Sequence, residues 1–148
     1  MGKIILVIAA HSDDEALGCA GTILKHTSAG DIVHLLFMTN GVGAREASVD
    51  DVEKRISASE NAINILNVSS VTNFNFPDNQ MDTVALLDVV KAVEGKVNEL
   101  SPEMVYTHWG DDLNVDHKIT HDAVVIACRP YPNQPVRSLY SFEVLSST

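Results

Sequence analysis

Apolar residues along this chain fall into two alternating patterns: short apolar runs, and longer stretches in which they recur at helical spacing. The short runs are rich in β-branched and aromatic residues and end at polar, Gly or Pro positions, which is typical of strands. They predict five strands, at Lys3–Ala10, Asp31–Thr39, Ser70–Phe76, Glu103–His108 and Val136–Leu145.

Between these runs, apolar residues recur every three or four positions, which predicts four amphipathic helices. The expected helices extend from Asp13 to Gly30, from Ser48 to Leu66, from Asp82 or Thr83 to Leu100, and from Val115 to Cys128. The residues expected to face the core on the second and third helices are Val52, Ile56, Ile63 and Leu66, then Leu87, Val90, Val93, Val97 and Leu100.

Strands and helices alternate from one end of the chain to the other. This order predicts an α/β fold, Rossmann-like and doubly wound, with a mostly parallel sheet of about five strands and helices on both faces. No repeat, low-complexity tract or linker interrupts the 148 residues, so we expect a single domain over 1–148. Ligands bind such sheets at the carboxyl ends of the strands, so the segments directly after each strand are the ones to inspect.

The charge balance of the chain argues against two kinds of partner. The chain has 20 acidic and 10 basic side chains and a formal net charge of −10. This balance argues against a nucleic-acid partner, which requires clustered Lys and Arg, and against binding to anionic membranes. The longest apolar run, Ile4–Ala10, is shorter than the ~20 residues of a membrane helix and lacks a signal-peptide cleavage site. We therefore expect a cytoplasmic protein without membrane insertion.

Two segments on the expected ligand-binding edge are rich in side chains that bind metals. The first is His11–Glu15, after the first strand, and the second is His108–His121, after the fourth; together they hold four of the six histidines. A catalytic zinc takes three nitrogen or oxygen ligands and keeps one position open. One His and one Asp from the first segment and one His from the second would supply them, and the adjacent aspartate could act as a base. Alternatively, the acidic run of the first segment could simply begin a helix.

The residues of these segments also resemble a known family. Ala10–Thr22 reads A-H-S-D-D-E-A-L-G-C-A-G-T and is similar to the LmbE/PIG-L signature, whose usual form is A-H-P-D-D-E-x-L-G-x-G-G-T. Asp112–His117 resembles the second motif of that family, which ends in an Asp-His or Asn-His pair. Three further features, Thr39-Asn40-Gly41, Arg55 and Phe76-Pro77-Asp78, follow in the family's order.

The resemblance implies a zinc-dependent N-deacetylase that acts on a small N-acetylated amino sugar or its conjugate. Carried over by position, His11, Asp14 and His117 would bind the metal, which could also be another divalent ion such as Fe²⁺. Asp13 would be the general base, and Arg55 would contact substrate. The helix that starts here is expected to keep both aspartates ionised, because its N-terminus favours negative charge.

The sequence departs from the family pattern at three points. Ser12 replaces the usual proline, and Asn114 stands where many members carry a histidine. An asparagine can donate a hydrogen bond to an oxyanion but cannot transfer a proton, so His108 is the candidate for that role. His121 follows His117 by one helical turn and is expected to support the ligand rather than bind the metal. Family members are also longer, so we expect a domain without the family's C-terminal portion.

Three alternatives remain open at this point. The chain could be a zinc amidase acting on another acylated amine, or a metal-binding relative whose catalysis is impaired. It could also be a nucleotide-binding module, although no G-x-G-x-x-G follows the first strand and the carboxylates would repel a pyrophosphate. The sequence leaves self-association open. Cys19 and Cys128 are expected to be buried thiols, because each lies in an apolar helical pattern. Neither has a neighbour at the spacing of a zinc knuckle.

Overall fold

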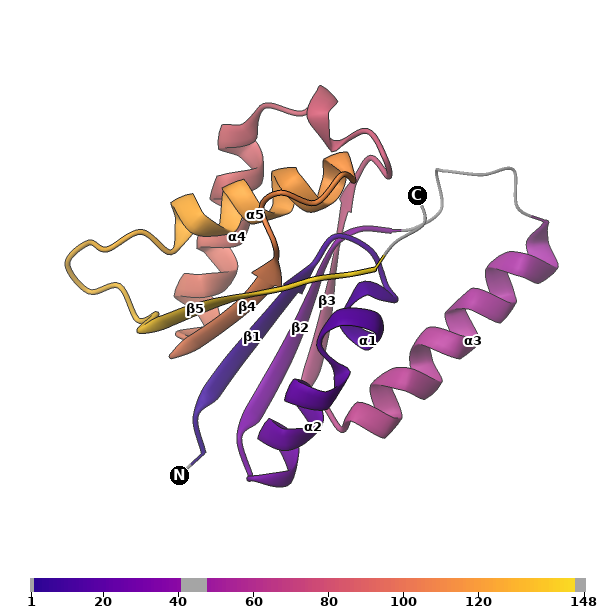
Figure 1. The fold of residues 1–148 in the computed structure, drawn as a ribbon, viewed down its shortest axis with the longest axis horizontal. Helices are drawn as coiled ribbons and strands as arrows, with labels where there is room; N and C mark the ends of the chain where they lie inside the picture. The colour runs from indigo at the N-terminus through magenta and orange to yellow at the C-terminus, as the bar shows by residue number, and fades with distance from the viewer. Residues whose placement is uncertain (1, 41–47, 146–148) are drawn as a thin grey trace.

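A computed structural model describes residues 2–40 and 48–145, so the predicted loop residues Gly41 to Gly43 lie outside the described part. Five strands form one sheet in the order β3-β2-β1-β4-β5, and every pair of neighbours is parallel (Figure 1). The strands are β1 Ile4–Ala9, β2 Ile32–Thr39, β3 Ser70–Phe76, β4 Met104–His108 and β5 Ser138–Phe142. The predicted α/β fold with a five-stranded parallel sheet is confirmed.

Helices cover both faces of this sheet, as predicted. α1, α2 and α3 lie on one face, and α4 and α5 lie on the other (Figure 1). Their bounds are α1 Asp14–Gly18, α2 Ala20–Ser28, α3 Val49–Leu66, α4 Leu86–Leu100 and α5 Val115–Ala127, with a 3-10 turn, η1, at Met81–Thr83. No helix in the described ranges is long and apolar enough to cross a bilayer.

The core is divided between the two faces of the sheet. In β1, Leu6 and Ile8 pack in the cluster that includes α4 and α5, whereas Ile5 and Val7 pack with residues of α2 and β2. All four side chains are buried, because a central parallel strand is covered on both faces. This explains why the strand appears in the sequence as a continuous apolar run rather than an alternating one.

The predicted first helix is broken in two. α1 ends at Gly18, Cys19 adopts a non-helical backbone conformation, and α2 starts at Ala20. The break changes the helical register, so that Ile23 is buried while Leu17 is 67% exposed. The prediction of one continuous helix, in which Leu17, Ala20, Ile23 and Leu24 recur at helical spacing, was therefore wrong, whereas the end of the second piece at Gly30, with φ of 84°, is as predicted.

The third predicted helix begins later than expected. Residues 81–83 form η1, Val84 and Ala85 are extended, and α4 starts only at Leu86. Leu87 lies in the first turn of α4 and is 60% exposed, whereas Val89 is fully buried. The expectation that Leu87 faces the core was wrong, because the helix begins only one residue before it and its first turn is left partly exposed, while the buried positions Val90, Val93 and Val97 are confirmed.

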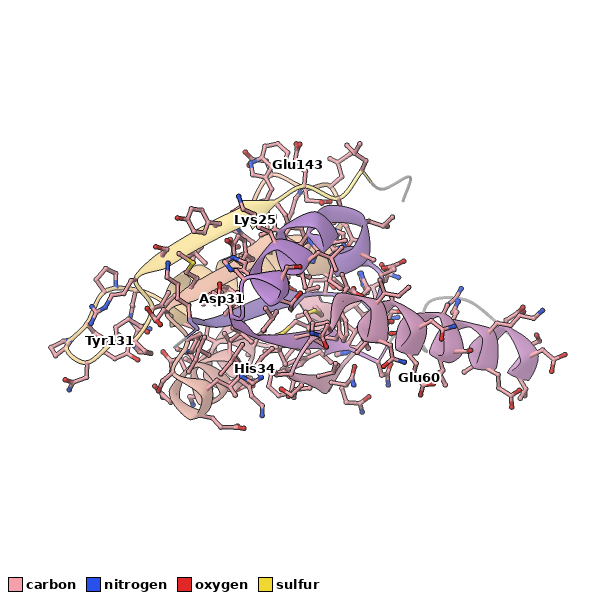
Figure 2. The ribbon with its side chains drawn as sticks, turned by 90° about the horizontal axis from the view of Figure 1, so that it is seen from below. Lys25, Asp31, His34, Glu60, Tyr131 and Glu143 are labelled. Carbon is pink, nitrogen blue, oxygen red and sulfur yellow. The ribbon has the colours of Figure 1, made fainter. Side chains whose placement is uncertain are left out.

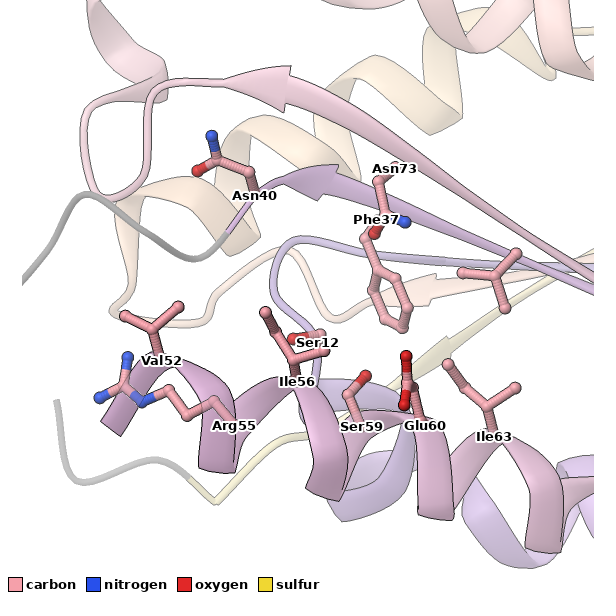
Figure 3. Close-up of a pocket in the computed structure, with 11 residues that line it drawn as sticks. Ser12, Phe37, Asn40, Val52, Arg55, Ile56, Ser59, Glu60, Ile63 and Asn73 are labelled. Atoms are coloured by element: carbon pink, nitrogen blue, oxygen red, sulfur yellow. The ribbon is translucent and has the colours of Figure 1, made fainter. Parts of the chain in front are cut away.

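α3 stands away from the sheet over most of its length. It begins as predicted, with Ser48 Oγ accepting a hydrogen bond from the Asp51 backbone N–H. Only Leu66, at its C-terminal end, is buried, and Ile56 is 54% exposed, so the prediction of a fully packed inner face was wrong. The helix projects outward toward its N-terminal end (Figure 2). A cavity of about 380 Å³ separates it from β2 and β3 (Figure 3).

Candidate metal centre

The topology of the sheet brings the two metal-binding segments together. β1 and β4 are neighbouring parallel strands, so the segments that follow them meet at the same edge. This is also where the sheet's winding reverses, since the chain passes from β1 to β2 on one side and β4 lies on the other. Crevices at such switch points are where open α/β sheets bind ligands.

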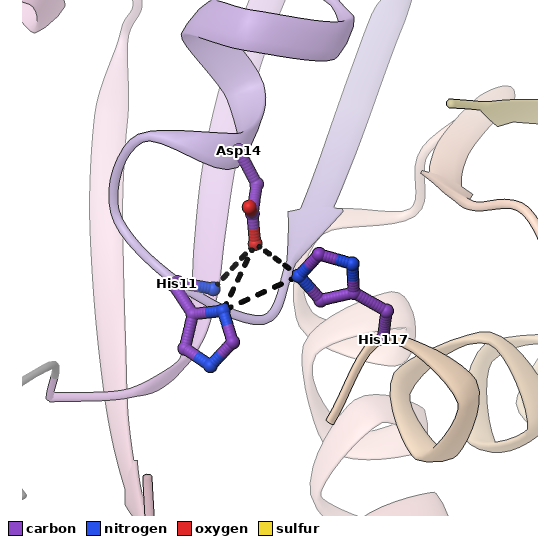
Figure 4. A group of neighbouring side chains, drawn as sticks. All are labelled: His11, Asp14 and His117. Carbon is purple, nitrogen blue, oxygen red and sulfur yellow. Dashed lines mark hydrogen bonds and ion pairs between the residues drawn. The ribbon is translucent and has the colours of Figure 1, made fainter. Parts of the chain in front are cut away.

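Three predicted metal ligands converge at this edge (Figure 4). Asp14 Oδ2 lies 3.3 Å from His11 Nδ1 and 3.2 Å from His117 Nε2, and the two nitrogens are 3.3 Å apart. A tetrahedral zinc with bonds of about 2.0–2.1 Å separates its ligand atoms by roughly 3.3 Å. The donor atoms and their spacing therefore fit a zinc ion bound by His11, Asp14 and His117.

Carboxylates hold the outer nitrogen of each histidine in this group. His11 Nε2 lies 2.9 Å from Asp116 Oδ2 and 3.1 Å from Asp78 Oδ1. His117 Nδ1 lies 2.9 Å from Asp112 Oδ2. A carboxylate that accepts the outer N–H fixes the tautomer and leaves the lone pair of the inner nitrogen for a metal.

Backbone N–H groups hold Asp116, the most buried of these carboxylates. Its Oδ2 accepts from the Asn79 N–H at 2.6 Å, and its Oδ1 accepts from the Met81 N–H at 3.1 Å. The turn after β3 is thereby tied to the start of α5, and Asp78 is placed beside His11. Sequence reasoning gave no role to Asp78 or Asp116, although each lies in a motif at the carboxyl edge.

Burial and hydrogen bonding set the charges of the three ligands. Burial would raise the pKa of Asp14, but the neighbouring imidazoles of His108, His11 and His117 outweigh it and hold that pKa far below its usual range. Burial would lower the pKa of His11, but Asp116 and Asp14 raise it to about 10. The metal-free site therefore holds an ionised Asp14 beside a protonated His11, and a bound cation would take the place of that proton.

Asp13 differs from its buried neighbour. It is exposed at the start of α1, with access for a substrate. Desolvation by the surrounding protein and the charge of Asp14 raise its pKa, although His11 and His117 oppose this. Burial and the charge of Asp14 thus act against the ionised form that the helix start was expected to favour at Asp13, and its ionisation at neutral pH stays a prediction. A more basic carboxylate suits proton transfer.

Glu15 supports the turn at the start of α1 from its buried side. It is almost completely buried, and its Oε2 accepts a hydrogen bond of 3.0 Å from the Asp13 backbone N–H. Burial raises the pKa of Glu15 to about 7. The buried carboxyl fixes the backbone of Asp13, a role that the sequence alone did not indicate.

His108, the predicted proton donor, is fully buried behind the ligands. Its ring stacks on His117 with centroids 3.9 Å apart, and its Nε2 accepts a hydrogen bond of 2.9 Å from the Ala10 N–H. Burial lowers the pKa of His108, which, like the hydrogen bond that its Nε2 accepts, favours the neutral ring. The His108 ring packs against the buried side of His117, and its proton transfer to substrate stays a prediction.

Asn114 caps α5 at the metal-binding edge. Its Oδ1 accepts from the backbone N–H groups of Asp116 at 2.9 Å and His117 at 3.3 Å. Its contact with an oxyanion stays a prediction, and only the amide NH₂ remains for it. His121 Nδ1 donates to the His108 carbonyl at 2.7 Å, which fits the expected supporting role.

Arg55 is exposed on α3, lines the cavity in Figure 3, and lowers the pKa of Asp13 through its charge.

Comparison with known proteins relates this chain to a family. Residues 6–128 match the family described as PIG-L, GlcNAc-PI de-N-acetylase. The uncharacterized deacetylase YaiS of Escherichia coli strain K12 is 30% identical over 135 residues, which cover 88% of this chain and 70% of that protein. The diacetylchitobiose deacetylase of Thermococcus kodakarensis is 32% identical over 83 residues, 53% of this chain and 31% of that protein.

A solved structure shares the fold over nearly the whole chain. The conserved protein TT1542 from Thermus thermophilus aligns with a TM-score of 0.82 and 23% identity, covering 97% of this chain and 67% of that one. The match therefore extends beyond the motifs to the order and packing of the elements. At this identity it supports the architecture alone.

Proposed function

The chain belongs to the PIG-L family, and from that premise we propose that it is a zinc-dependent hydrolase that removes the acetyl group from the nitrogen of an N-acetyl amino sugar or its conjugate. The observation that carries the proposal is the spacing of His11 Nδ1, Asp14 Oδ2 and His117 Nε2, each 3.2–3.3 Å from the others, beside the exposed carboxylate of Asp13. The E. coli and Thermococcus relatives, both deacetylases by name, support the reaction class.

The donor set supports zinc and admits related ions. Two imidazole nitrogens and one carboxylate oxygen are a ligand set of catalytic zinc, and Fe²⁺ accepts the same donors. When bound, the ion would supply Lewis-acid polarisation of the amide carbonyl and lower the pKa of a water molecule. The carboxylates behind His11 and His117 hold these ligands in place before an ion arrives.

Asp13 carries the proton in the proposed reaction. Its carboxylate accepts a proton from the attacking water as the oxygen of that water bonds to the acetyl carbon. The amide C–N bond then breaks, and the proton held on Asp13 passes to the leaving nitrogen, so that acetate and a free amine result. The raised pKa of Asp13 serves both steps. It makes the carboxylate a stronger base toward the water, and it keeps the accepted proton available for the leaving nitrogen at a pH closer to neutral.

Two side chains would assist at the edges of the reacting group. The amide NH₂ of Asn114 would donate to the oxyanion, since its carbonyl oxygen caps α5. Arg55 would contact the hydroxyl groups of the sugar from α3, because it lines the cavity that opens beside Ser12.

The proposal is tested by release of free amine from a panel of substrates by the zinc-loaded protein. The panel contains N-acetylglucosamine, N,N'-diacetylchitobiose and acetylated amines that lack a sugar. We expect turnover of N-acetyl sugars, its loss in Asp13→Asn, and normal turnover in Asp88→Asn, a matched change at an exposed position on α4. Turnover confined to amines without a sugar would support the alternative amidase. Zinc binding without any turnover would show a metal-binding relative with impaired catalysis.

A further inference from the structure

We propose that the cavity beneath α3 binds an uncharged apolar aglycone, an alkyl or aryl group attached to the amino sugar of the substrate. The inference rests on the proposed deacetylase function and extends it to a substrate class. It is drawn from the position, lining and charge of the cavity.

The cavity leads directly away from the metal-binding edge. Ser12, between the ligand His11 and the base Asp13, is one of its lining residues, and Asn40 follows the carboxyl end of β2. From there the cavity extends past Phe37 to Val71. Val71 pairs with β2 at a position closer to the start of that strand than Phe37. A substrate with its amide at the metal site could therefore extend into it.

The cavity exists because α3 contacts the sheet at one end only. Leu66 anchors the C-terminal end, while apolar side chains earlier in the helix face the sheet across open space (Figure 3). Ile56 stays 54% exposed although it points toward Phe37, and an apolar pair held apart in this way loses contacts that a ligand could restore. Its volume of about 380 Å³ is within the range of small-molecule sites, which is roughly 300–1,000 Å³.

Polar and apolar side chains both line the cavity. The end nearest the metal site holds the polar groups of Arg55, Ser12 and Asn40, whose amide donates to Asn75 Oδ1, beside the apolar side chains of Val52 and Ile56. Farther along, Phe37, Val71 and Ile63 form an apolar surface that Glu60 and Asn73 interrupt.

This order matches a substrate in which a hydroxylated ring lies between the amide and an apolar group. A long N-acyl chain would instead place its first methylenes, those next to the reacting carbon, against the polar end. The three polar groups nearest the metal therefore favour an aglycone over an acyl chain as the occupant.

Charge further restricts the occupant. Glu60 lines the middle of the cavity and points toward the strands in Figure 3, beside Asn73 and Phe37. A carboxylate at this position would repel a phosphate or carboxylate on the aglycone, and the net charge of −10 acts in the same direction. The charge therefore excludes an anionic aglycone, and the apolar side chains of Phe37, Ile63 and Val71 favour an uncharged one over a cation.

The test is a chain-length series of β-glycosides of N-acetylglucosamine with methyl, butyl and hexyl aglycones. If the alkyl group enters the cavity, kcat/KM should rise by about fourfold for each methylene that is buried. Ile63→Trp should fill the far end and reduce the ratio of hexyl to methyl kcat/KM to about one. Ile65→Trp is the matched control, since Ile65 is on the same helix but 71% exposed and outside the cavity, and it should keep the full ratio.

Direct binding separates this proposal from the deacetylase proposal. Hexyl β-D-glucoside has no acetyl group, so its affinity reports on the cavity even if no substrate is turned over. Binding to wild type and to Ile65→Trp but not to Ile63→Trp supports the cavity whatever the activity. Equal kcat/KM for the methyl and hexyl glycosides, with no binding of the glucoside, would overturn the inference. A higher kcat/KM for an N-hexanoyl methyl glycoside than for the N-acetyl hexyl glycoside would overturn the choice of aglycone over acyl chain.

Discussion

Zinc binding should release protons from this site at neutral pH. The pKa of His11 in the metal-free protein is about 10, because Asp116 and Asp14 stabilise the imidazolium more than burial disfavours it. At pH 7.5, roughly one molecule in 300 then has a neutral His11. A metal ligand must be unprotonated, so binding expels about one proton from His11, and the raised pKa of His117 adds to this.

The magnitude follows from linkage. With one proton released per ion, the apparent affinity should rise about tenfold per pH unit, or about 100-fold from pH 6.5 to 8.5. The raised pKa of His11 also affects the stability of the metal-free fold, which falls with rising pH whereas the apparent zinc affinity rises. A histidine with a raised pKa stabilises the metal-free fold fully below about 6.5, and this contribution is lost as the pH rises toward about 10.

Isothermal titration calorimetry in buffers of different ionisation enthalpy counts these protons directly. Asp116→Asn is the informative variant, because it removes the largest interaction that raises the pKa of His11 and should reduce the number released. The comparison also separates protons lost by His11 from any lost by bound water, which both proteins share. Release of less than about half a proton in the wild type, or an unchanged count in Asp116→Asn, would refute the reasoning.

Three further predictions concern the residues around the ligands. Asp13→Asn should lower kcat by about 10²–10⁴-fold with an unchanged zinc content, measured by amine release and metal analysis; loss of the zinc instead would contradict a purely basic role. Asn114→Ala should cost about 1 kcal/mol in the free energy of unfolding by urea, and Asn114→Ser should retain most of it, since serine also caps helices; equal losses would argue against the capping role. Gly110→Ala should destabilise by about 1–3 kcal/mol, because its Cβ would lie 2.8 Å from the ring of His121, which is bonded to the His108 carbonyl. The same change in a His121→Ala background should cost much less, and additive losses in urea unfolding would exclude the clash.

The sequence predicted that the candidate metal ligands lie close together, because their proximity depends on topology rather than on detailed packing; the choice of these residues as ligands came from the family resemblance and stays a prediction. In a parallel sheet, every strand delivers its following residues to the same edge. His11 after the first strand and His117 after the fourth therefore could be placed near each other without knowledge of their contacts. The structure brings their nitrogens within 3.3 Å.

The supporting carboxylates could not be assigned in this way. Asp116 and His11 are 105 positions apart in sequence, and their contact depends on the angle at which α5 enters the site. Asp78 reaches the same histidine only because the turn after β3 is held by Asp116. The signal present in the sequence was weak: an aspartate directly before a ligand, and another after a strand-ending proline.

The departures in the helices have a local cause. Apolar spacing alone does not reveal a break at Cys19, which changes the register of the residues that follow, or the later start at Leu86, which leaves Leu87 in an exposed first turn. For α3 the spacing correctly identified the face turned toward the sheet. It did not predict the distance between α3 and the sheet. A hydrophobic pattern shows which face of a helix turns inward, but not how closely that face packs.

The most direct test of the metal centre is the zinc content of the purified protein beside that of His117→Ala, with His34→Ala as a control for the loss of an imidazole outside the site. We predict about one equivalent of zinc in wild type and in His34→Ala, and almost none in His117→Ala. A wild-type protein that carries no metal and cannot be loaded, or a His117→Ala protein that retains its zinc, would contradict the assignment of this site.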